Sequence, residues 1–268
     1  MSIIDQDFKP ISAPLEHNTI LVTGAAGRLG SQVVRLALEQ GANVIATDVS
    51  TEGLHSLAKI LTSTLQNNFL PVVSDVTDSQ NIKNLINRSV SSFGVINGVV
   101  HCAYPRSEKW GASLEDLEQE FLNKDLSLQL GGAIMLSQAV HNLFVAQGGG
   151  CLVHVSSIQG VQAPKFEHYH GTGMHSPIEY AAIKAGIISI TRWLAKYSSN
   201  NNIRVNCVSP GGILDAQHQD FLQRYRESCT NIGMLSAEQV ASVIVFLLTP
   251  AAAAINGQNV IVDDGWTL

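Results

Sequence analysis

The chain has 268 residues, of which 45% are hydrophobic and 14% are charged, and its formal net charge is −6. This apolar composition excludes intrinsic disorder, and the length suits one large domain or two small ones. The negative charge and the lack of a Lys/Arg run argue against a nucleic-acid partner.

The first 17 residues are polar and contain proline, so we expect a tail (1–17) ahead of a single domain (18–268). The tail lacks the positively charged start and apolar run of a signal peptide. The apolar segment 240–248 is too short to cross a bilayer, so no membrane partner is expected. The cysteines contain no C-x-x-C pair, which favours reduced thiols and a cytoplasmic location over a disulfide framework.

The first predicted strand, Thr19–Thr23, runs directly into a glycine-rich turn. Apolar residues at helical spacing follow the turn until Gly41. A strand, a glycine turn and a helix in this order favour a dinucleotide site, because backbone N–H groups and a helix N-terminus face the pyrophosphate. An ordinary glycine-rich turn is the alternative. The cofactor-binding residues predicted here are Gly24, Gly27, Arg28, Leu29 and Gly30.

The second predicted strand, Asn43–Asp48, ends in an acid about 20 residues beyond the glycine turn. A carboxylate in this place accepts hydrogen bonds from the adenosine ribose and repels a 2′-phosphate. Asp48 therefore favours NAD over NADP. Capping of a following helix is a second role that does not exclude the first.

Strands and helices then alternate to the end of the chain. The alternation indicates a doubly wound parallel α/β sheet of seven strands, a Rossmann fold, with helices on both faces. No linker or internal repeat interrupts it. The further strands are predicted at residues 69–74, 98–103, 150–155, 203–208 and 259–262, and the helices at 79–93, 114–146 (one or two), 177–197 and 236–248.

Tyr180 and Lys184 lie four residues apart and so share one face of the predicted helix. A phenol has a pKa of about 10, and a neighbouring ammonium is expected to lower it toward neutrality by stabilising the phenolate. The preceding strand ends in Ser156 and Ser157, whose hydroxyls are suited to hold a substrate oxygen. Alone, the tyrosine–lysine pair is a weak signal, since such pairs are common on solvated helices.

In chain order, these motifs resemble the short-chain dehydrogenase/reductase family over about residues 18–265. The resemblance implies an NAD-dependent oxidoreductase that transfers a hydride between nicotinamide and an alcohol or ketone of a small-molecule substrate. The motifs that carry it are Thr23-Gly24 with Gly30, Asp48, Asp75-Val76, Ala103, Ser157, Tyr180 with Lys184, Asn206 and Pro210-Gly211.

The resemblance also implies individual roles. Ser157 would bind the substrate oxygen, Tyr180 would act as acid–base, and Lys184 would also contact the nicotinamide ribose. Alignment on Ser137-Gln138 places Gln129 where the family has a catalytic asparagine. The other residues implied to bind the cofactor are Asp75 and Val76 beside the adenine, Cys102 and Ala103 after a strand, and Pro210, Gly211 and Ile213 beside the nicotinamide.

Several positions depart from the family pattern. The glycines are spaced as in extended sugar-nucleotide members, and Arg28 replaces a glycine. Arg28 either contacts a cofactor phosphate or is an exposed first-turn residue. The run His-Cys-Ala-Tyr at 101–104 replaces the usual Asn-Asn-Ala-Gly, and Asp215 replaces a nicotinamide-binding threonine.

The segment between Ser157 and Tyr180 resembles the flagellin-modification branch, whose members act in the synthesis of nine-carbon acidic sugars. Its insertion at 162–176 predicts a lid over a polyhydroxylated or phosphorylated substrate, with Lys165 and His168 as donors. A structural loop without substrate contacts is the alternative. Zinc binding by its histidines is disfavoured, because no Cys or acid completes a usual set, and no metal is predicted.

The sequence thus predicts oxidation or reduction of a sugar, sugar-phosphate or nucleotide-sugar derivative. One alternative is a dehydratase or epimerase that uses NAD transiently, and another is a non-catalytic NAD-binding regulator. The family resemblance further implies a homodimer or homotetramer built on the long helices.

Overall fold

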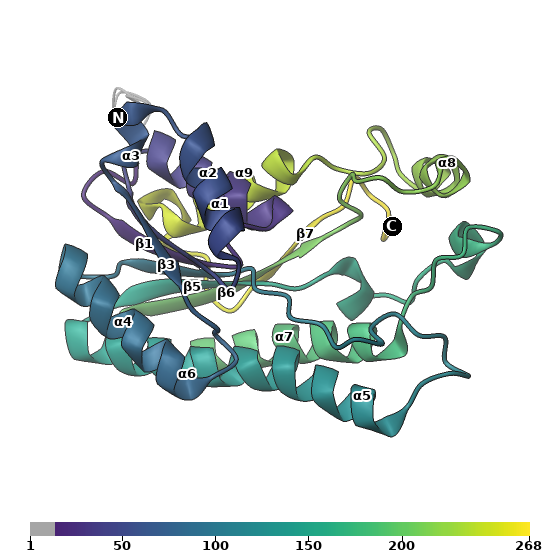
Figure 1. Cartoon of the computed structure of the whole chain (residues 1–268), viewed down its shortest axis with the longest axis horizontal. Coiled ribbons are helices and arrows are strands. Elements are labelled where there is room, and N and C mark those ends of the chain that lie inside the picture. The colour runs from purple at the N-terminus through teal and green to yellow at the C-terminus, as the bar shows by residue number, and fades with distance from the viewer. Residues whose placement is uncertain (1–13) are drawn as a thin grey trace, which may run out of the picture.

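The computed structural model describes residues 14–268 (Figure 1). In this part of the chain seven parallel strands form one sheet. The order reverses between β1 and β4, and the predicted single-domain doubly wound fold is confirmed. Across the sheet the strands are β3 (Phe69–Val73), β2 (Asn43–Asp48), β1 (Thr19–Thr23), β4 (Gly98–His101), β5 (Gly150–Val155), β6 (Ile203–Pro210) and β7 (Asn259–Val262).

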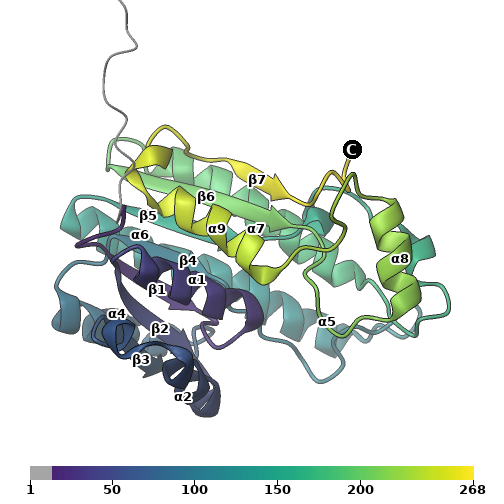
Figure 2. The same ribbon diagram turned by 90° about the horizontal axis from the view of Figure 1, so that it is seen from above.

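Helices cover both faces of the sheet (Figures 1 and 2). One face carries α1 (Arg28–Glu39), α2 (Thr51–Ile60) and α9 (Ala237–Leu248), and the other carries α4 (Ser79–Phe93), α6 (Gly132–Gln147) and α7 (Ile178–Tyr197). The central strands are largely apolar because both of their faces are covered, and every residue of β1 is buried.

The segment predicted over 114–146 to hold one or two helices holds two. It consists of α5 (Gln119–Asp125) and α6, joined by a π-helical turn at Leu126–Gly131. Residues 114–118 precede the first helix and are not helical. Such π-turns often occur at functional sites, and Gln129 lies within this one.

Two short helices were not predicted, α3 (Ser63–Gln66) and α8 (Gln219–Glu227), whereas α2 is the helix expected after Asp48. Helix α8 stands at the end of the molecule toward which the strands point (Figure 1). It buries Phe221 and Tyr225, which lie one turn apart. This small apolar stripe is the signal that sequence analysis missed.

The predicted tail is too long by at least three residues. Leu15 is fully buried in the apolar layer that includes α1, and its N–H donates to the Gln40 carbonyl at 3.1 Å. The domain therefore includes Leu15. The prediction that the first 17 residues contain no signal peptide concerns mainly residues 1–13, which lie outside the described part. Within residues 14–268 we find no helix with the length and apolarity needed to span a membrane.

Two buried histidines face each other between the central strands β4 and β5. His101 Nδ1 lies 3.2 Å from His154 Nδ1, and His154 Nε2 lies 3.1 Å from the Ser137 hydroxyl. Burial lowers the pKa of both imidazoles, that of His154 to about 4. Both rings are therefore neutral at pH 7, which makes the pair compatible with an apolar sheet. The four cysteines are free thiols, and those in β5 and β6 are buried.

Candidate active site

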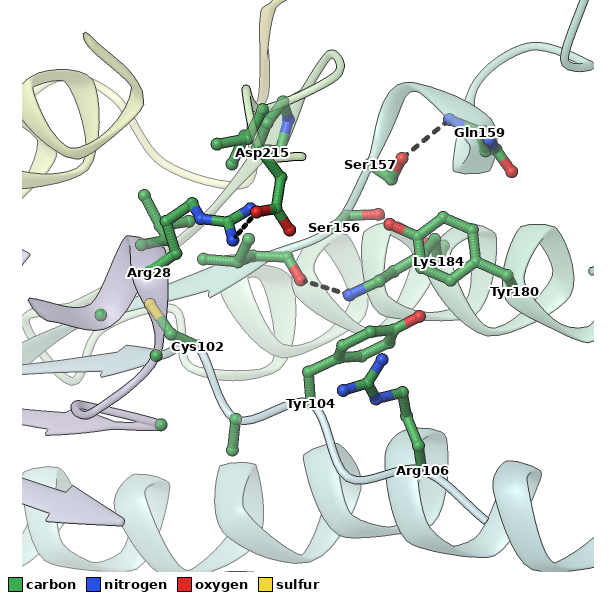
Figure 3. A pocket seen from close by; sticks show the side chains of 18 of the residues that line it. Arg28, Cys102, Tyr104, Arg106, Ser156, Ser157, Gln159, Tyr180, Lys184 and Asp215 are labelled. Atoms are coloured by element: carbon green, nitrogen blue, oxygen red, sulfur yellow. Dashed lines mark hydrogen bonds and ion pairs between the residues drawn. The ribbon is translucent and has the colours of Figure 1, made fainter. Parts of the chain in front are cut away.

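A cavity of about 690 Å³ opens at the carboxyl ends of the strands, where open α/β sheets usually bind ligands. Figure 3 shows part of it. Every residue predicted to bind the cofactor lines this cavity. Besides Tyr180 and Lys184, these are Gly24, Gly27, Arg28, Leu29, Gly30, Asp48, Asp75, Val76, Cys102, Ala103, Pro210, Gly211 and Ile213.

The glycine turn is shaped by close backbone contacts. Gly24 has a φ of +63°, and a Cβ there would lie 2.8 Å from the backbone of Ala103. A Cβ on Gly30 would lie 2.1 Å from the Gly24 carbonyl oxygen. No side chain caps α1 and no acid stands in its first turn, so its positive end faces the cavity uncompensated. This arrangement fits the pyrophosphate of a dinucleotide.

Asp48 is held rigidly at the end of β2. Its carboxylate accepts the N–H groups of Ala26 and Ser50, each at 3.0 Å. Helix α2 is capped by the Ser50 hydroxyl, which accepts from Gly53 at 2.9 Å, and Asp48 is not the cap. The carboxylate is thereby fixed beside the glycine turn.

An ion pair joins two walls of the cavity. Arg28 Nη2 lies 2.5 Å from Asp215 Oδ1, which connects the glycine turn to the loop after β6 (Figure 3). Its hydrogen bond to Arg28 lowers the pKa of the Asp215 carboxyl. Arg28 is therefore engaged rather than freely exposed, and both side chains are about half accessible.

Lys184 lies beneath Tyr180 on α7, but it does not bond to the phenol. Its ammonium donates to the Val155 carbonyl at 3.1 Å and lies 5.5 Å from the centre of the Tyr180 ring. Burial lowers the pKa of Lys184 to about 8. The charge is thus close to the phenol and poorly solvated.

The pKa of Tyr180 is raised, which is opposite to the direction predicted from the sequence. Burial of the phenol is the largest cause, and the Ser157 hydroxyl partly offsets it. The Lys184 ammonium donates to the Val155 carbonyl and not to the phenol, so no hydrogen bond from Lys184 stabilises the phenolate.

The two serines after β5 differ in orientation. Ser156 is buried, and its hydroxyl donates to the Lys184 carbonyl at 2.7 Å, so it tethers α7 to the sheet. The Ser157 oxygen accepts the Gln159 N–H at 3.1 Å and lies on the same side of the cavity as Tyr180 (Figure 3). Ser157 is the one available to a substrate oxygen.

Gln129 is not brought to the cavity wall. Its side chain is buried, and neither amide atom has a hydrogen-bond partner among residues 14–268. A buried amide without partners is costly, so this position is unusual for a purely structural residue. The structure does not join Gln129 directly to Tyr180 and Lys184.

The predicted lid is docked on helix α8. Arg224 Nη1 donates to the His170 carbonyl at 2.6 Å, and the Lys165 ammonium lies 4.9 Å from the centre of the Trp266 ring. His168 is buried, with Nε2 2.9 Å from the Ser228 hydroxyl. The His168 imidazole is thus engaged with Ser228, and the loop reaches the cavity through His168 and Tyr169. Donation from His168 to a substrate stays a prediction.

Sequence analysis missed the aromatic end of the cavity. Tyr104 packs edge-to-face on Tyr180 and Trp110, with ring centres 5.9 and 5.5 Å apart. It stands where the family pattern has glycine, and that departure was the available signal. The other missed lining residues at this end include Arg106, Gln159, Phe221, Tyr225, Met234 and Trp266.

The histidines of the 162–176 loop form no metal-binding group. Over residues 14–268 no set of three or more His, Cys, Asp or Glu side chains is placed to hold a metal ion. His168 is committed to Ser228 and is surrounded by aromatic rings.

The fold and the cavity together define a dinucleotide-binding enzyme with a serine, a tyrosine and a lysine at one end of its site. A family model described as enoyl-(acyl carrier protein) reductase matches residues 24–267. The chain belongs to the short-chain dehydrogenase/reductase family and is an oxidoreductase that uses a nicotinamide cofactor.

Known relatives match the chain along nearly its whole length. Post-translational flagellin modification protein A of Campylobacter coli is 38% identical over 255 residues, covering 95% of this chain and 100% of that protein. The 7alpha-hydroxysteroid dehydrogenase of Bacteroides fragilis is 30% identical, covering 94% and 95%. A short-chain dehydrogenase of Leptospira borgpetersenii with bound NAD+ is 29% identical with a TM-score of 0.86, covering 98% of each chain.

Proposed function

We propose that the protein is an NAD-dependent dehydrogenase or reductase that acts on an alcohol or ketone of a sugar derivative. One observation carries this proposal. Ser157, Tyr180 and Lys184 line the same cavity as Asp48, which stands at the end of another strand. The cavity therefore combines a proton-transfer group with a cofactor groove.

The cofactor supplies the hydride chemistry when it is bound, and the side chains handle the oxygen and its proton. Ser157 holds the substrate oxygen, and Tyr180 gives or takes the proton on it. The Lys184 charge favours the phenolate once cofactor and substrate displace water from the site. Its lowered pKa reflects the burial that strengthens this electrostatic effect.

A preference for NAD is proposed from Asp48. Its carboxylate is fixed by two backbone N–H groups, so it cannot swing away from a 2′-phosphate without losing both bonds. Arg28 lies nearby, but it is engaged with Asp215. The Leptospira relative with bound NAD+ is consistent with this choice.

Titration of NADH and NADPH by fluorescence tests the cofactor preference. We expect NADH to bind at least about tenfold more tightly, and Asp48→Ala to narrow the gap by removing the repulsion. Glu115→Gln serves as the control, because it removes an exposed negative charge outside the cavity. Equal affinities in the parent protein would contradict the NAD assignment.

A sugar derivative is proposed from the branch that the 157–180 segment resembles and from the cavity itself. Among the aromatic rings that line the cavity, Tyr104 is exposed and can pack on the C–H face of a sugar ring. Gln159 and Tyr169 add polar groups, and they are bonded to each other at 3.1 Å.

Replacement of the proton donor tests the reaction. NADH formation is measured with a panel of polyols, sugars and their derivatives, and Tyr180→Phe should lower kcat by about 10²-fold or more while NADH affinity is unchanged. Tyr197→Phe is the matched control, since Tyr197 is an exposed phenol on the same helix. Activity of Tyr180→Phe within a few-fold of the parent would refute the role of the phenol.

A further inference from the structure

Charge is distributed unevenly along the cavity wall. The acids that line the cavity are Asp48, Asp75 and Asp215, and they stand at the cofactor end, at or after β2, β3 and β6. The aromatic end of the cavity, which includes Tyr104, Tyr180 and Trp266, has no carboxylate among its described lining residues. Arg106 is the cation at this end.

Arg106 makes no ion pair with an acid within residues 14–268, and the other cations near it are engaged with an acid or a backbone carbonyl. At the cavity, Arg28 is paired with Asp215 and Lys184 is bound to a backbone carbonyl. Outside the cavity, Lys124 is paired with Glu108 at 2.9 Å. Arg106 is exposed, and its guanidinium carbon lies 5.5 Å from the centre of the Tyr104 ring.

Tyr104 places this guanidinium next to the reacting group. Its ring contacts both Tyr180, at 5.9 Å between centres, and the Lys184 ammonium, at 5.2 Å. Figure 3 shows Arg106 beside Tyr104, in the same part of the site as Tyr180. Burial raises the pKa of the Tyr104 phenol, so it stays neutral and does not compensate the guanidinium.

The backbone next to Arg106 is fixed by a buried acid. Asp125 accepts the Ser107 N–H at 2.7 Å and the Ser107 hydroxyl at 2.6 Å. Asp125 therefore anchors the loop next to Arg106. The Arg106 guanidinium lies against the Tyr104 ring and makes no ion pair with an acid of the described chain, so it is available to an anionic ligand.

A guanidinium binds carboxylate or phosphate groups through two parallel hydrogen bonds. We propose that Arg106 determines substrate specificity by binding an anionic group, a carboxylate or a phosphate, of a substrate whose reacting oxygen lies at Tyr180. Tyr104 positions the arginine through its ring face. This inference rests on the proposed function, because it concerns the substrate of the same site.

Matched pairs of charged and neutral compounds test the inference. One set is d-glucuronate, d-glucose 6-phosphate and d-glucose, and the other is cis-4-hydroxycyclohexanecarboxylate and its methyl ester. NADH formation is followed with NAD+, and binding to the NADH complex is measured by calorimetry. We expect a preference of about tenfold or more for charged members, as for other hydrogen bonds to charged groups. The two glucose derivatives distinguish carboxylate from phosphate.

Variants of Arg106 identify the source of the preference. In Arg106→Gln, kcat/KM for the charged and the neutral members should differ by no more than about threefold, because KM for the charged members rises while kcat is largely retained. Arg106→Lys should keep part of the preference for charged members. Lys124→Gln is the control, since it removes an exposed cation already paired with Glu108. It should leave the preference unchanged.

The outcomes separate this inference from the proposed function. Equal oxidation of charged and neutral members refutes the anion site and leaves the oxidoreductase intact. Tighter binding of charged members without NADH formation supports the anion site and counts against the proposed reaction. No preference in either turnover or binding, or a preference that survives in Arg106→Gln, overturns the inference.

Discussion

Lys184 is a charged side chain in a place that water scarcely reaches. Burial lowers its pKa from the ordinary 10.5 to about 8. Between these values the unfolded chain binds the proton and the folded chain does not, so folding stability rises with pH across this window. At pH 7 both states are protonated, and the folded state bears the full cost of the buried charge.

Lys184→Met should therefore raise the Tm of the cofactor-free protein at pH 7, because it removes that cost. The gain should shrink as pH rises from about 8 to 10, where the parent lysine becomes neutral on folding. Thermal unfolding at four pH values measures the difference in Tm between Lys184→Met and the parent. Lys196→Met, at an exposed site on the same helix, is the control. A difference in Tm that does not depend on pH would contradict the lowered pKa of Lys184.

Single residues also mark the limit of what the sequence predicts. Glycines, acids and the tyrosine–lysine pair were placed correctly on the cavity wall, since each has a fixed spacing from a strand end. Arg106 and Trp266 were missed because their roles depend on which ring or loop folds against them. The Tyr180 pKa was predicted in the wrong direction, because spacing along a helix does not reveal the depth of burial.

The 162–176 loop and helix α8 behave as one unit at the scale of elements. His168 is enclosed by the rings of Phe221, Tyr225 and Trp266. Its removal leaves a cavity and an unpaired Ser228 hydroxyl, whereas Lys165 loses only a contact with the Trp266 ring. The two residues should thus differ in their effect on folding.

His168→Ala should lower the free energy of unfolding by about 2–4 kcal/mol, and Lys165→Ala by less than about 1 kcal/mol. Burial lowers the pKa of His168, so the unfolded chain binds more protons below about pH 6.5 and stability falls as pH drops. Urea unfolding of both variants at pH 7 and pH 5.5 measures these effects. Equal losses at pH 7 would show that His168 is not the anchor of the loop.

The alternating strands and helices were predictable because parallel strands buried on both faces appear as apolar runs between amphipathic helices. Helix α8 was not predicted because it is short and mostly polar, and it gains its stability from the loop that packs on it. The position of the break at Leu126–Gly131 was not predicted for a different reason. Apolar residues continue through the π-turn, so the sequence pattern shows no interruption there.

At the scale of the molecule, the outer surfaces of α6 and α7 expose large apolar side chains. Trp193 and Tyr197 are 63% and 62% exposed and stack with their ring centres 4.8 Å apart. Ile134 and Met135 on α6 are also exposed. Exposed apolar groups on these helices support the proposed homodimer or homotetramer built on them.

Trp193→Glu with Tyr197→Glu should convert the assembly to a smaller species, because two charges would be buried in the interface. Sedimentation velocity at several concentrations measures the change, and circular dichroism confirms that the fold is kept. Ile60→Glu is the matched control, since Ile60 is 70% exposed on α2, away from these helices. An unchanged sedimentation coefficient in the double variant would place the interface elsewhere.

The pairing of β1 with β4 has a consequence for synthesis on the ribosome. One edge of β1 stays without its partner until residues 98–101 have emerged, so its N–H and C=O groups are open to wrong pairing. The glycine turn likewise lacks the wall that Ala103 provides, and the opposite wall at residues 210–215 arrives later still. A nicotinamide dinucleotide can therefore stabilise the finished domain, but the cavity that binds it is incomplete until residues 210–215 have been made.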